Sequence, residues 1–146
     1  MRLNLQTDFA LRVLMFLAAQ KRQASIEEIA DAYGISRNHL TKVARHLADM
    51  GLISARRGRG GGLELVLPPE EIGVGKVVRE MESLSGFVEC FERDSNTCPV
   101  AGACGLQGAL RSALDDFLAR LDDYTVADLL PRPDRFTKAL AKSPPG

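Results

Sequence analysis

Apolar residues recur every three or four positions through most of the first fifty residues, a spacing typical of helices that bury one face. A first helix is predicted to begin at Thr7, because its hydroxyl group can accept a hydrogen bond from the free backbone N–H groups of the first turn. The apolar stripe of this helix comprises Phe9, Val13, Phe16 and Leu17.

Two further helices are predicted, joined by a tight turn. Ser25, with Glu28 three residues later, forms a capping box that opens the second helix, and Gly34 ends it in a left-handed turn. Ser36 caps the third helix, and Gly51 ends it. The buried stripe of the third helix consists of Leu40, Val43, Ala44 and Leu47. Two helices in this arrangement are typical of a helix-turn-helix motif.

A glycine-rich hairpin is predicted after the third helix. A short strand over residues 53–55 leads into the run Arg56-Arg57-Gly58-Arg59-Gly60-Gly61-Gly62, and a return strand follows on which Leu63, Leu65 and Leu67 alternate. The glycines permit positive φ angles and a close approach of the backbone to phosphates. The run lacks the Gly-Lys-Ser/Thr ending of a nucleotide-binding P-loop. The predicted fold class is therefore mostly α, a winged helix-turn-helix with a two-stranded wing.

A long helix is predicted in the second half of the chain. Pro68-Pro69 marks a boundary, a short helix over residues 74–84 follows, and residues 86–105 show no period. The long helix covers residues 105–124, and its apolar seam comprises Leu106, Leu110, Leu114, Phe117 and Leu121. The same helix of a second copy is the economical partner for this seam, so we predict that it is a dimerisation helix. Packing against the first helix is an alternative that does not exclude dimerisation.

The chain divides into five predicted regions. Residues 1–67 form the winged helix-turn-helix, 68–85 a connecting helix and 86–105 a cysteine loop. Residues 106–130 hold the dimerisation helix and a short helix over 126–130, which follows Thr125 with Asp128 in the capping-box position. Residues 131–146 are expected to be a flexible tail.

The composition is typical of a soluble protein with one domain. With 146 residues, 45% of them hydrophobic, the chain can bury a core without disulfide bonds. Three cysteines are an odd number, which argues against a secreted disulfide framework. No apolar stretch near the N-terminus is long enough to span a membrane, and none has the form of a signal peptide. A cytoplasmic location without membrane attachment is therefore expected.

The net charge is zero, but the two halves of the chain differ in sign. Residues 1–67 carry ten Lys and Arg against six Asp and Glu, whereas residues 68–146 carry nine against thirteen. The basic residues gather on the third helix and the wing, which favours double-stranded DNA as a partner. RNA is disfavoured, because no aromatic residues lie among the basic ones. An enzyme is not expected, because both histidines lie on the third helix and no other pair of base and nucleophile is evident.

The third helix is predicted to enter the major groove. Asn38 suits an adenine edge, and Arg37 suits a guanine edge or a phosphate. Arg59, at the wing tip, is expected to insert into a narrow minor groove, and Arg56 and Arg57 are expected to meet phosphates. Backbone oxygens are the expected partners of Thr41, Lys42 and Arg45. The complete predicted DNA-binding set is Ser36, Arg37, Asn38, His39, Thr41, Lys42, Arg45, Arg56, Arg57, Arg59 and Gly60.

Cys90, Cys98 and Cys104 all lie in the aperiodic segment. Structural zinc usually needs four ligands, and neither a fourth cysteine nor a nearby histidine is present. A reversible disulfide is a second possibility. An iron–sulfur cluster fits better, because thiolates bind iron and a glycine-rich loop can wrap closely around it. Three cysteines leave one coordination position for another donor, which favours a sensor over an electron carrier.

Three segments resemble those of the winged-helix iron–sulfur transcriptional repressors, and most closely their nitric-oxide-sensing members. They are Ile35-Ser36-Arg37-Asn38-His39-Leu40, Arg57-Gly58-Arg59-Gly60-Gly61-Gly62-Leu63, and Glu89-Cys90-Phe91 followed by Cys98 and Cys104. The resemblance implies a homodimer, joined by the long helix, that binds palindromic operators. It also implies a 4Fe-4S cluster, held by the three cysteines and the partner subunit's Asp8, whose reaction with nitric oxide releases DNA.

The resemblance leaves other cluster types and other switches open. Cluster-assembly regulators of the same family hold a 2Fe-2S cluster with three cysteines and a histidine, and Gln107, a poor iron ligand, occupies that histidine's position here. The gap between Cys90 and Cys98 is longer than is usual in the family, which affects loop geometry more than ligation. Glu89, Glu92 and Asp94 are carboxylates closer in sequence to the cysteines than Asp8, and any of them could be the fourth ligand instead. Two rivals are the same DNA reader under a thiol or zinc switch, and a redox carrier on this scaffold.

Overall fold

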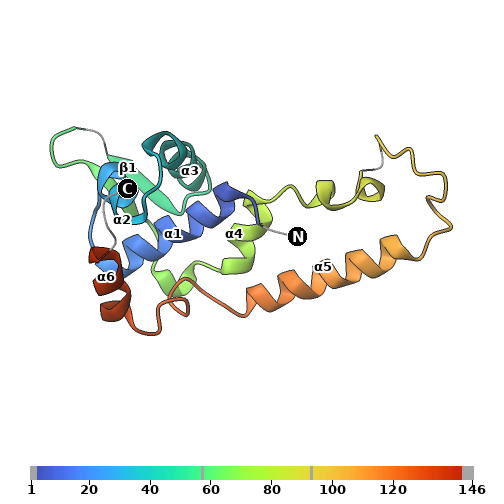
Figure 1. The fold of residues 1–146 in the computed structure, drawn as a ribbon. Helices are drawn as coiled ribbons and strands as arrows, with labels where there is room; N and C mark the ends of the chain where they lie inside the picture. Colours follow the sequence, from blue (N-terminus) through green and yellow to red (C-terminus); the bar gives the residue numbers. More distant parts are fainter. Residues whose placement is uncertain (1–2, 57, 93, 143–146) are drawn as a thin grey trace.

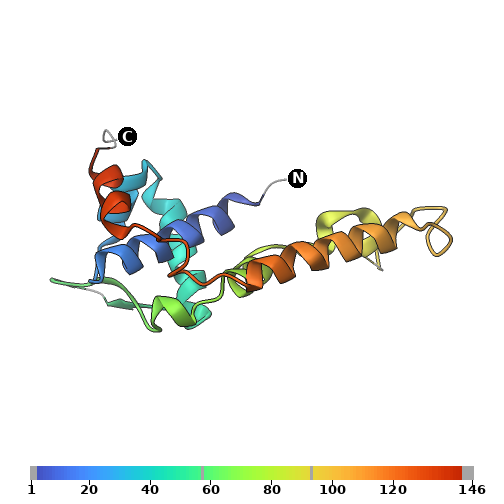
Figure 2. The same ribbon diagram turned by 90° about the horizontal axis from the view of Figure 1, so that it is seen from below.

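The chain folds into a body and a projecting arm (Figures 1 and 2). The computed structural model describes residues 3–56, 58–92 and 94–142. The elements of the body are α1 (Leu5–Gln20), α2 (Ile26–Tyr33), α3 (Arg37–Asp49), β1 (Ile53–Arg56), β2 (Gly62–Leu65), η1 (Pro69–Glu71), α4 (Val74–Met81) and α6 (Pro133–Ala141). Those of the arm are η2 (Leu84–Phe87), η3 (Glu89–Phe91) and α5 (Leu106–Asp122). The predicted mostly α fold with a two-stranded wing and a long helix is confirmed.

Helix α1 begins one turn earlier than predicted. Asn4 is its N-cap, and the Asn4 side-chain oxygen accepts hydrogen bonds from the backbone N–H groups of Gln6 (2.6 Å) and Thr7 (3.1 Å). Thr7 is wrong as a cap, because it lies inside the helix on the buried face. Both residue types can cap helices, and the apolar face that extends upstream decides in favour of Asn4.

The predicted turn of the helix-turn-helix is confirmed. The Ser25 hydroxyl accepts from the backbone N–H of Glu28 (3.0 Å), and the Ser36 hydroxyl accepts from that of His39 (3.3 Å). Gly34 ends α2 with φ of 64°. The return half of the capping box is absent, because the Glu28 carboxylate pairs with Arg22 instead.

The wing is a two-stranded antiparallel hairpin. Its register pairs Ile53 with Leu65 and Arg56 with Gly62, so β1 is one residue longer than predicted. Leu67 lies beyond the end of β2, although it still packs on the body core. The wing is joined to the body by a backbone pair between Ala24 and Leu63, with N–H···O distances of 3.0 and 2.7 Å.

The apolar residues form two separate clusters, which we call the body core and the arm core. The body core is built on α1, α2, α3 and the wing, and it includes Val77 and Met81 of α4. The arm core contains Val74 and Val78 of α4, Phe91 of η3, and Leu114 and Leu118 of α5. Helix α4 therefore has one face in each cluster, because residues four apart share a helix face.

The chain beyond α5 differs from the prediction in two places. Residues 126–130 form turns, not a helix, although Thr125 and Asp128 make the expected reciprocal hydrogen bonds. Their backbone is tied to the η1–α4 connection, where Val126 N–H donates to the Ile72 carbonyl (2.9 Å). Helix α6 replaces most of the predicted flexible tail, because Phe136 and Leu140 pack against the body core. Residues 143–146 lie outside the described residues.

The predicted connecting helix is shorter than residues 74–84. Helix α4 ends at Met81, and Leu84 already belongs to the 3-10 turn η2. In the part of the chain that the structure describes, no helix is both long enough and apolar enough to cross a membrane.

Candidate functional site

Helix α3 presents a polar and cationic face to solvent. Its buried stripe is the predicted one, Leu40, Val43, Ala44 and Leu47. The opposite positions are all exposed, and they are Ser36, Arg37, Asn38, His39, Thr41, Lys42 and Arg45. No salt bridge within the described residues engages Lys42 or Arg45. Lys42 and Arg45 can therefore offer positive charge to a partner without first breaking an ion pair within the described residues.

Two residues of this face have partners that the sequence did not predict. Arg37 lies 3.7 Å from the Glu27 carboxylate of α2, a long and exposed pair that costs little to break. The Thr41 hydroxyl donates to the Arg37 carbonyl one turn back (2.8 Å). The Thr41 proton is thus already used within the helix, so in this rotamer its oxygen can only accept hydrogen bonds.

His39 lies at the edge of the face, against α1. Its ring centroid is 6.1 Å from that of Phe9. With Lys42 and the first turns of α1, the two rings line a cavity of ≈ 500 Å³. His39, predicted to bind DNA, therefore also lies where α1 and α3 meet. A shift of α1 would displace His39 and with it the edge of the exposed face of α3.

The wing carries an exposed arginine at its tip. Arg59 and Gly60 are exposed, whereas Arg56 pairs with Glu64 across the hairpin (3.2 Å). The same carboxylate accepts a hydrogen bond from the Ser54 hydroxyl (3.1 Å), which stiffens the stem of the wing. The predicted phosphate contact Arg57 lies outside the described residues.

The three cysteines lie on the loop of the arm and are free thiols. Cys90 and Cys98 are half-buried, and Cys104 is exposed next to the start of α5. The Gln107 side-chain amide donates a hydrogen bond to the Cys90 carbonyl, which anchors the loop to α5. Gln107 therefore has a structural role that sequence reasoning, which treated it only as a poor ligand, did not find.

A pair of hydrogen bonds, which we call the Glu89–Thr97 clamp, joins the two ends of the segment between Cys90 and Cys98. The Glu89 carboxylate accepts hydrogen bonds from both the hydroxyl and the backbone N–H of Thr97, each at 2.7 Å. The hydroxyl, and then the N–H, hold the pKa of Glu89 below its ordinary value. The residues next to Cys90 and Cys98 are thus in contact across this segment. Glu89 is engaged in this clamp, which weakens it as an alternative iron ligand.

The donor chemistry of the loop fits an iron–sulfur cluster, although the donors are not gathered. Within the described residues, no group of three or more His, Cys, Asp or Glu side chains is placed to hold a metal ion. Thiolates are nevertheless the ligands that such clusters use. The first turn of α5 begins at Gly105 without a side-chain cap, so its free N–H groups favour negative charge beside Cys104.

Asp8 lies on α1 of the body. Its carboxylate pairs with Arg12 one turn later (2.8 Å), and both side chains are partly exposed. The Arg12 guanidinium lies 5.9 Å from the ring centre of Phe9 and 5.7 Å from that of Tyr33. The Tyr33 hydroxyl donates to the Arg12 carbonyl (3.1 Å), and burial raises the pKa of Tyr33 to about 12.

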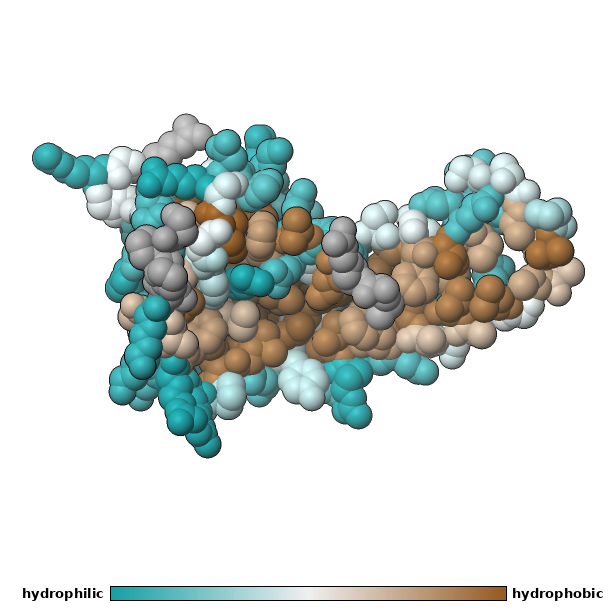
Figure 3. Space-filling model, in the orientation of Figure 1, coloured by the Kyte–Doolittle hydropathy of each residue, from teal (hydrophilic) through white to brown (hydrophobic). Residues whose placement is uncertain are grey.

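The predicted seam of α5 is divided between the chain's own core and solvent. Leu114 is buried in the arm core together with Leu118, which the prediction had not included. Leu110, Phe117 and Leu121 are half-buried, whereas Leu106 is 61% exposed. Helix α4, more than α1, covers the seam. Figure 3 shows a band of apolar side chains that continues from the body along the arm.

The chain is similar in sequence to bacterial transcriptional regulators. The profile of the Rrf2 family, described as iron-dependent transcriptional regulators, matches residues 3–132. The HTH-type transcriptional regulator NsrR of Bacillus subtilis (strain 168) is 44% identical over 142 residues, which cover 96% of this chain and 97% of that protein. The NsrR of Halalkalibacterium halodurans is 43% identical over 146 residues, covering 99% and 100%.

Solved structures share the fold at lower identity. The oxidised form of Staphylococcus aureus CymR matches with a TM-score of 0.69 and 24% identity, covering 90% of this chain and 97% of that one. T. potens IscR matches with a TM-score of 0.71 and 21% identity, covering 100% and 94%. At this identity the likeness establishes the shared architecture of body and arm.

Proposed function

Because the chain belongs to the Rrf2 family of iron-dependent transcriptional regulators, we propose that it is a homodimeric DNA-binding repressor that senses nitric oxide through an iron–sulfur cluster of the 4Fe-4S type. The observation that carries the proposal is the exposed cationic face of α3 beside the wing, in a chain 44% identical to a regulator named NsrR. Transcriptional regulators of this family are not enzymes.

DNA recognition follows from the residues of α3 and the wing. Asn38 and Arg37 lie at the exposed start of α3, where recognition helices contact base edges. Lys42 and Arg45 are one and two turns further along and suit phosphates. Two copies related by a twofold axis would read a palindrome whose half-sites lie about 34 Å apart or multiples of that distance.

Cys90, Cys98 and Cys104 would hold the cluster, with the partner subunit's Asp8 as the fourth ligand. A bound cluster supplies an iron atom with a weak oxygen ligand, at which nitric oxide can bind. The free N–H groups at the start of α5 would favour the negative charge of such a cluster, and the Gln107 side chain would hold the loop beside it. The Glu89–Thr97 clamp links the residues next to Cys90 and Cys98 across the long gap between them.

Arg12 gives Asp8 a second partner. An Asp8 carboxylate that left a ligand position would meet the Arg12 guanidinium on its own helix, which lies 2.8 Å from it in this structure. Arg12 also packs on Phe9, and the Phe9 ring faces His39 of α3. If Asp8 exchanged the cluster for Arg12, the change would therefore reach α3 through contacts within one protomer.

The test combines anaerobic native mass spectrometry with DNA binding. A duplex selected from a random-sequence library serves as the probe, and fluorescence anisotropy follows its release during stepwise addition of nitric oxide. We expect one 4Fe-4S cluster per subunit in the dimer, and a loss of affinity that parallels nitrosylation. An Asp8→Ala protein should bind the probe but respond less to nitric oxide. An iron-free dimer that binds DNA tightly, with zinc or a disulfide at the cysteines, would overturn cluster sensing and leave the DNA reader. A 2Fe-2S mass would indicate the cluster-assembly type.

A further inference from the structure

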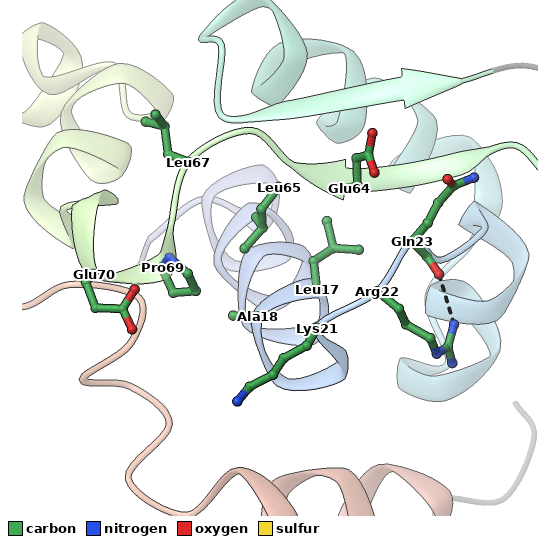
Figure 4. Close-up of a pocket in the computed structure, with 10 residues that line it drawn as sticks. All are labelled: Leu17, Ala18, Lys21, Arg22, Gln23, Glu64, Leu65, Leu67, Pro69 and Glu70. Atoms are coloured by element: carbon green, nitrogen blue, oxygen red, sulfur yellow. Dashed lines mark hydrogen bonds between the residues drawn. The ribbon is translucent and has the colours of Figure 1, made fainter.

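The wing tip is held by a side chain from the connection between α1 and α2. Gln23 lies in the connection between α1 and α2, and its side-chain amide N–H donates to the Gly60 carbonyl at 2.7 Å. The two residues are 37 positions apart in the chain. Figure 4 shows the Gln23 side chain extending from that connection toward the wing. The Gln23 main chain is itself fixed, because its carbonyl accepts from the Arg22 guanidinium (3.0 Å, dashed in Figure 4).

The Gly60 carbonyl belongs to the turn that carries Arg59. Gly61 N–H donates to the Gly58 carbonyl (2.9 Å), which closes a four-residue turn with Arg59 and Gly60 at its centre. Gly58 and Gly60 have positive φ angles of 96° and 79°, so the turn needs glycine at both positions. Glycine-rich backbone has many accessible conformations, and an added hydrogen bond at Gly60 selects one of them.

A second observation shows that the close approach is built into the wing. A Cβ atom on Gly62 would lie 2.7 Å from the Ala24 carbonyl oxygen and 2.9 Å from Cγ of Gln23. Only glycine at this position lets the wing lie against the α1–α2 connection. The backbone pair between Ala24 and Leu63 holds strand β2, and the Gln23 amide holds the tip of the wing.

We propose that Gln23 is a positioning residue for DNA binding, which fixes the wing tip so that Arg59 is presented to the minor groove. The proposal rests on the proposed function, in which the wing meets DNA. A narrow groove accepts a guanidinium only in a limited range of orientations. A wing tip that is ordered before binding loses less conformational freedom on insertion, so affinity rises without a new contact to DNA.

A double-mutant cycle tests the proposal on the full chain. Gln23→Ala, Arg59→Ala and the double variant are titrated against the library-selected duplex by fluorescence anisotropy. We expect Gln23→Ala to weaken binding about 3- to 10-fold in the wild-type background and to have no further effect when Arg59 is already alanine. Gln20→Ala, the same change three residues earlier in α1, is the matched control and should leave affinity unchanged.

Two further measurements separate the outcomes. ¹⁵N relaxation of the free protein should show Gly60 and Gly61 more mobile in Gln23→Ala than in wild type, while the melting temperature stays the same. Equal losses in both backgrounds, or unchanged mobility, would overturn the positioning role. If Arg59→Ala binds like wild type, the minor-groove part of the proposed function fails instead, and the relaxation data still decide whether Gln23 orders the wing.

Discussion

Thr7 is fully buried, and its hydroxyl oxygen has no hydrogen-bond partner among the described residues. A buried hydroxyl group without a partner costs about 1–3 kcal/mol in the free energy of unfolding. Valine has nearly the same shape and no polar atom. The buried Thr7 hydroxyl group thus destabilises the fold one residue before the proposed ligand Asp8.

We predict that Thr7→Val raises the free energy of unfolding by about 1 kcal/mol, because the unsatisfied hydroxyl group is removed. Urea denaturation followed by circular dichroism measures the change. Thr7→Ser, which keeps the hydroxyl and loses the methyl group, is the control and should be less stable than wild type. A Thr7→Val protein less stable than wild type would show that the hydroxyl has a partner, such as a bound water molecule.

The helix ends that depend only on residues nearby in the chain could be predicted from the sequence. Ser25, Gly34 and Ser36 end or begin helices through contacts within four residues, and all three predictions are confirmed. The cap of α1 was wrong because Asn4 and Thr7 are both capable caps. The partners of the site, Glu27 for Arg37 and Gln23 for the wing, come from other elements and leave no local signal.

Helix α4 contributes buried residues to both the body core and the arm core. Val77, on one face, is 1% exposed in the body core, and Val78, on the other, is 1% exposed in the arm core. At the start of α1, Asn4 N–H donates to the Glu82 carboxylate (2.8 Å), and the Asn4 amide donates to the Met81 carbonyl (3.2 Å). The last residues of α4 thus hold the helix that carries Asp8.

We predict that Val78→Ala and Val77→Ala each lower stability by about 2 kcal/mol but open different parts of the chain. Val78→Ala should speed amide hydrogen exchange in α5 while leaving α2 and α3 unchanged, because it weakens only the arm core. Val77→Ala should speed exchange in α1 and α3. Identical exchange patterns in the two variants would show that the cores unfold together.

Helices α1 to α5 could be predicted because each has a clear apolar period, and the wing because glycines and alternating leucines mark it. Helix α6 was missed, since only Phe136 and Leu140 mark its buried side and its stability comes from the body core. The prediction of a helix over 126–130 was wrong because contacts distant in the sequence override the local signal. Its capping signal is satisfied locally, but tertiary hydrogen bonds to residues 69 and 72 hold the backbone in turns.

For the molecule as a whole, the arm is the part that one chain does not fully cover. Its apolar band continues beyond α4, and Leu106 at the outer end of α5 is 61% exposed. A second copy packed along α5 would cover this band, and it would bring a second reading helix under the same twofold axis.

We predict that Leu106→Glu raises the dissociation constant of the dimer by at least about 10-fold, because a carboxylate would be buried in the interface. Sedimentation velocity across a concentration series measures the shift. Val66→Glu is the control, a change of the same kind at a side chain 54% exposed just beyond β2. Equal dissociation constants for wild type and Leu106→Glu would place the interface elsewhere.

The separation of the two cores has an evolutionary consequence. Leu84, Phe87, Val88 and Phe91 pack only in the arm core, and none of the described residues between 84 and 105 belongs to the body core. We therefore expect insertions, deletions and changes of donor type in this segment to leave the folding of the body intact. If the loop holds the sensing group, as proposed, its donors and the spacing between Cys90 and Cys98 can change while the body that carries α3 and the wing is kept. The same tolerance makes the segment a site for grafting foreign receptor loops in engineered switches.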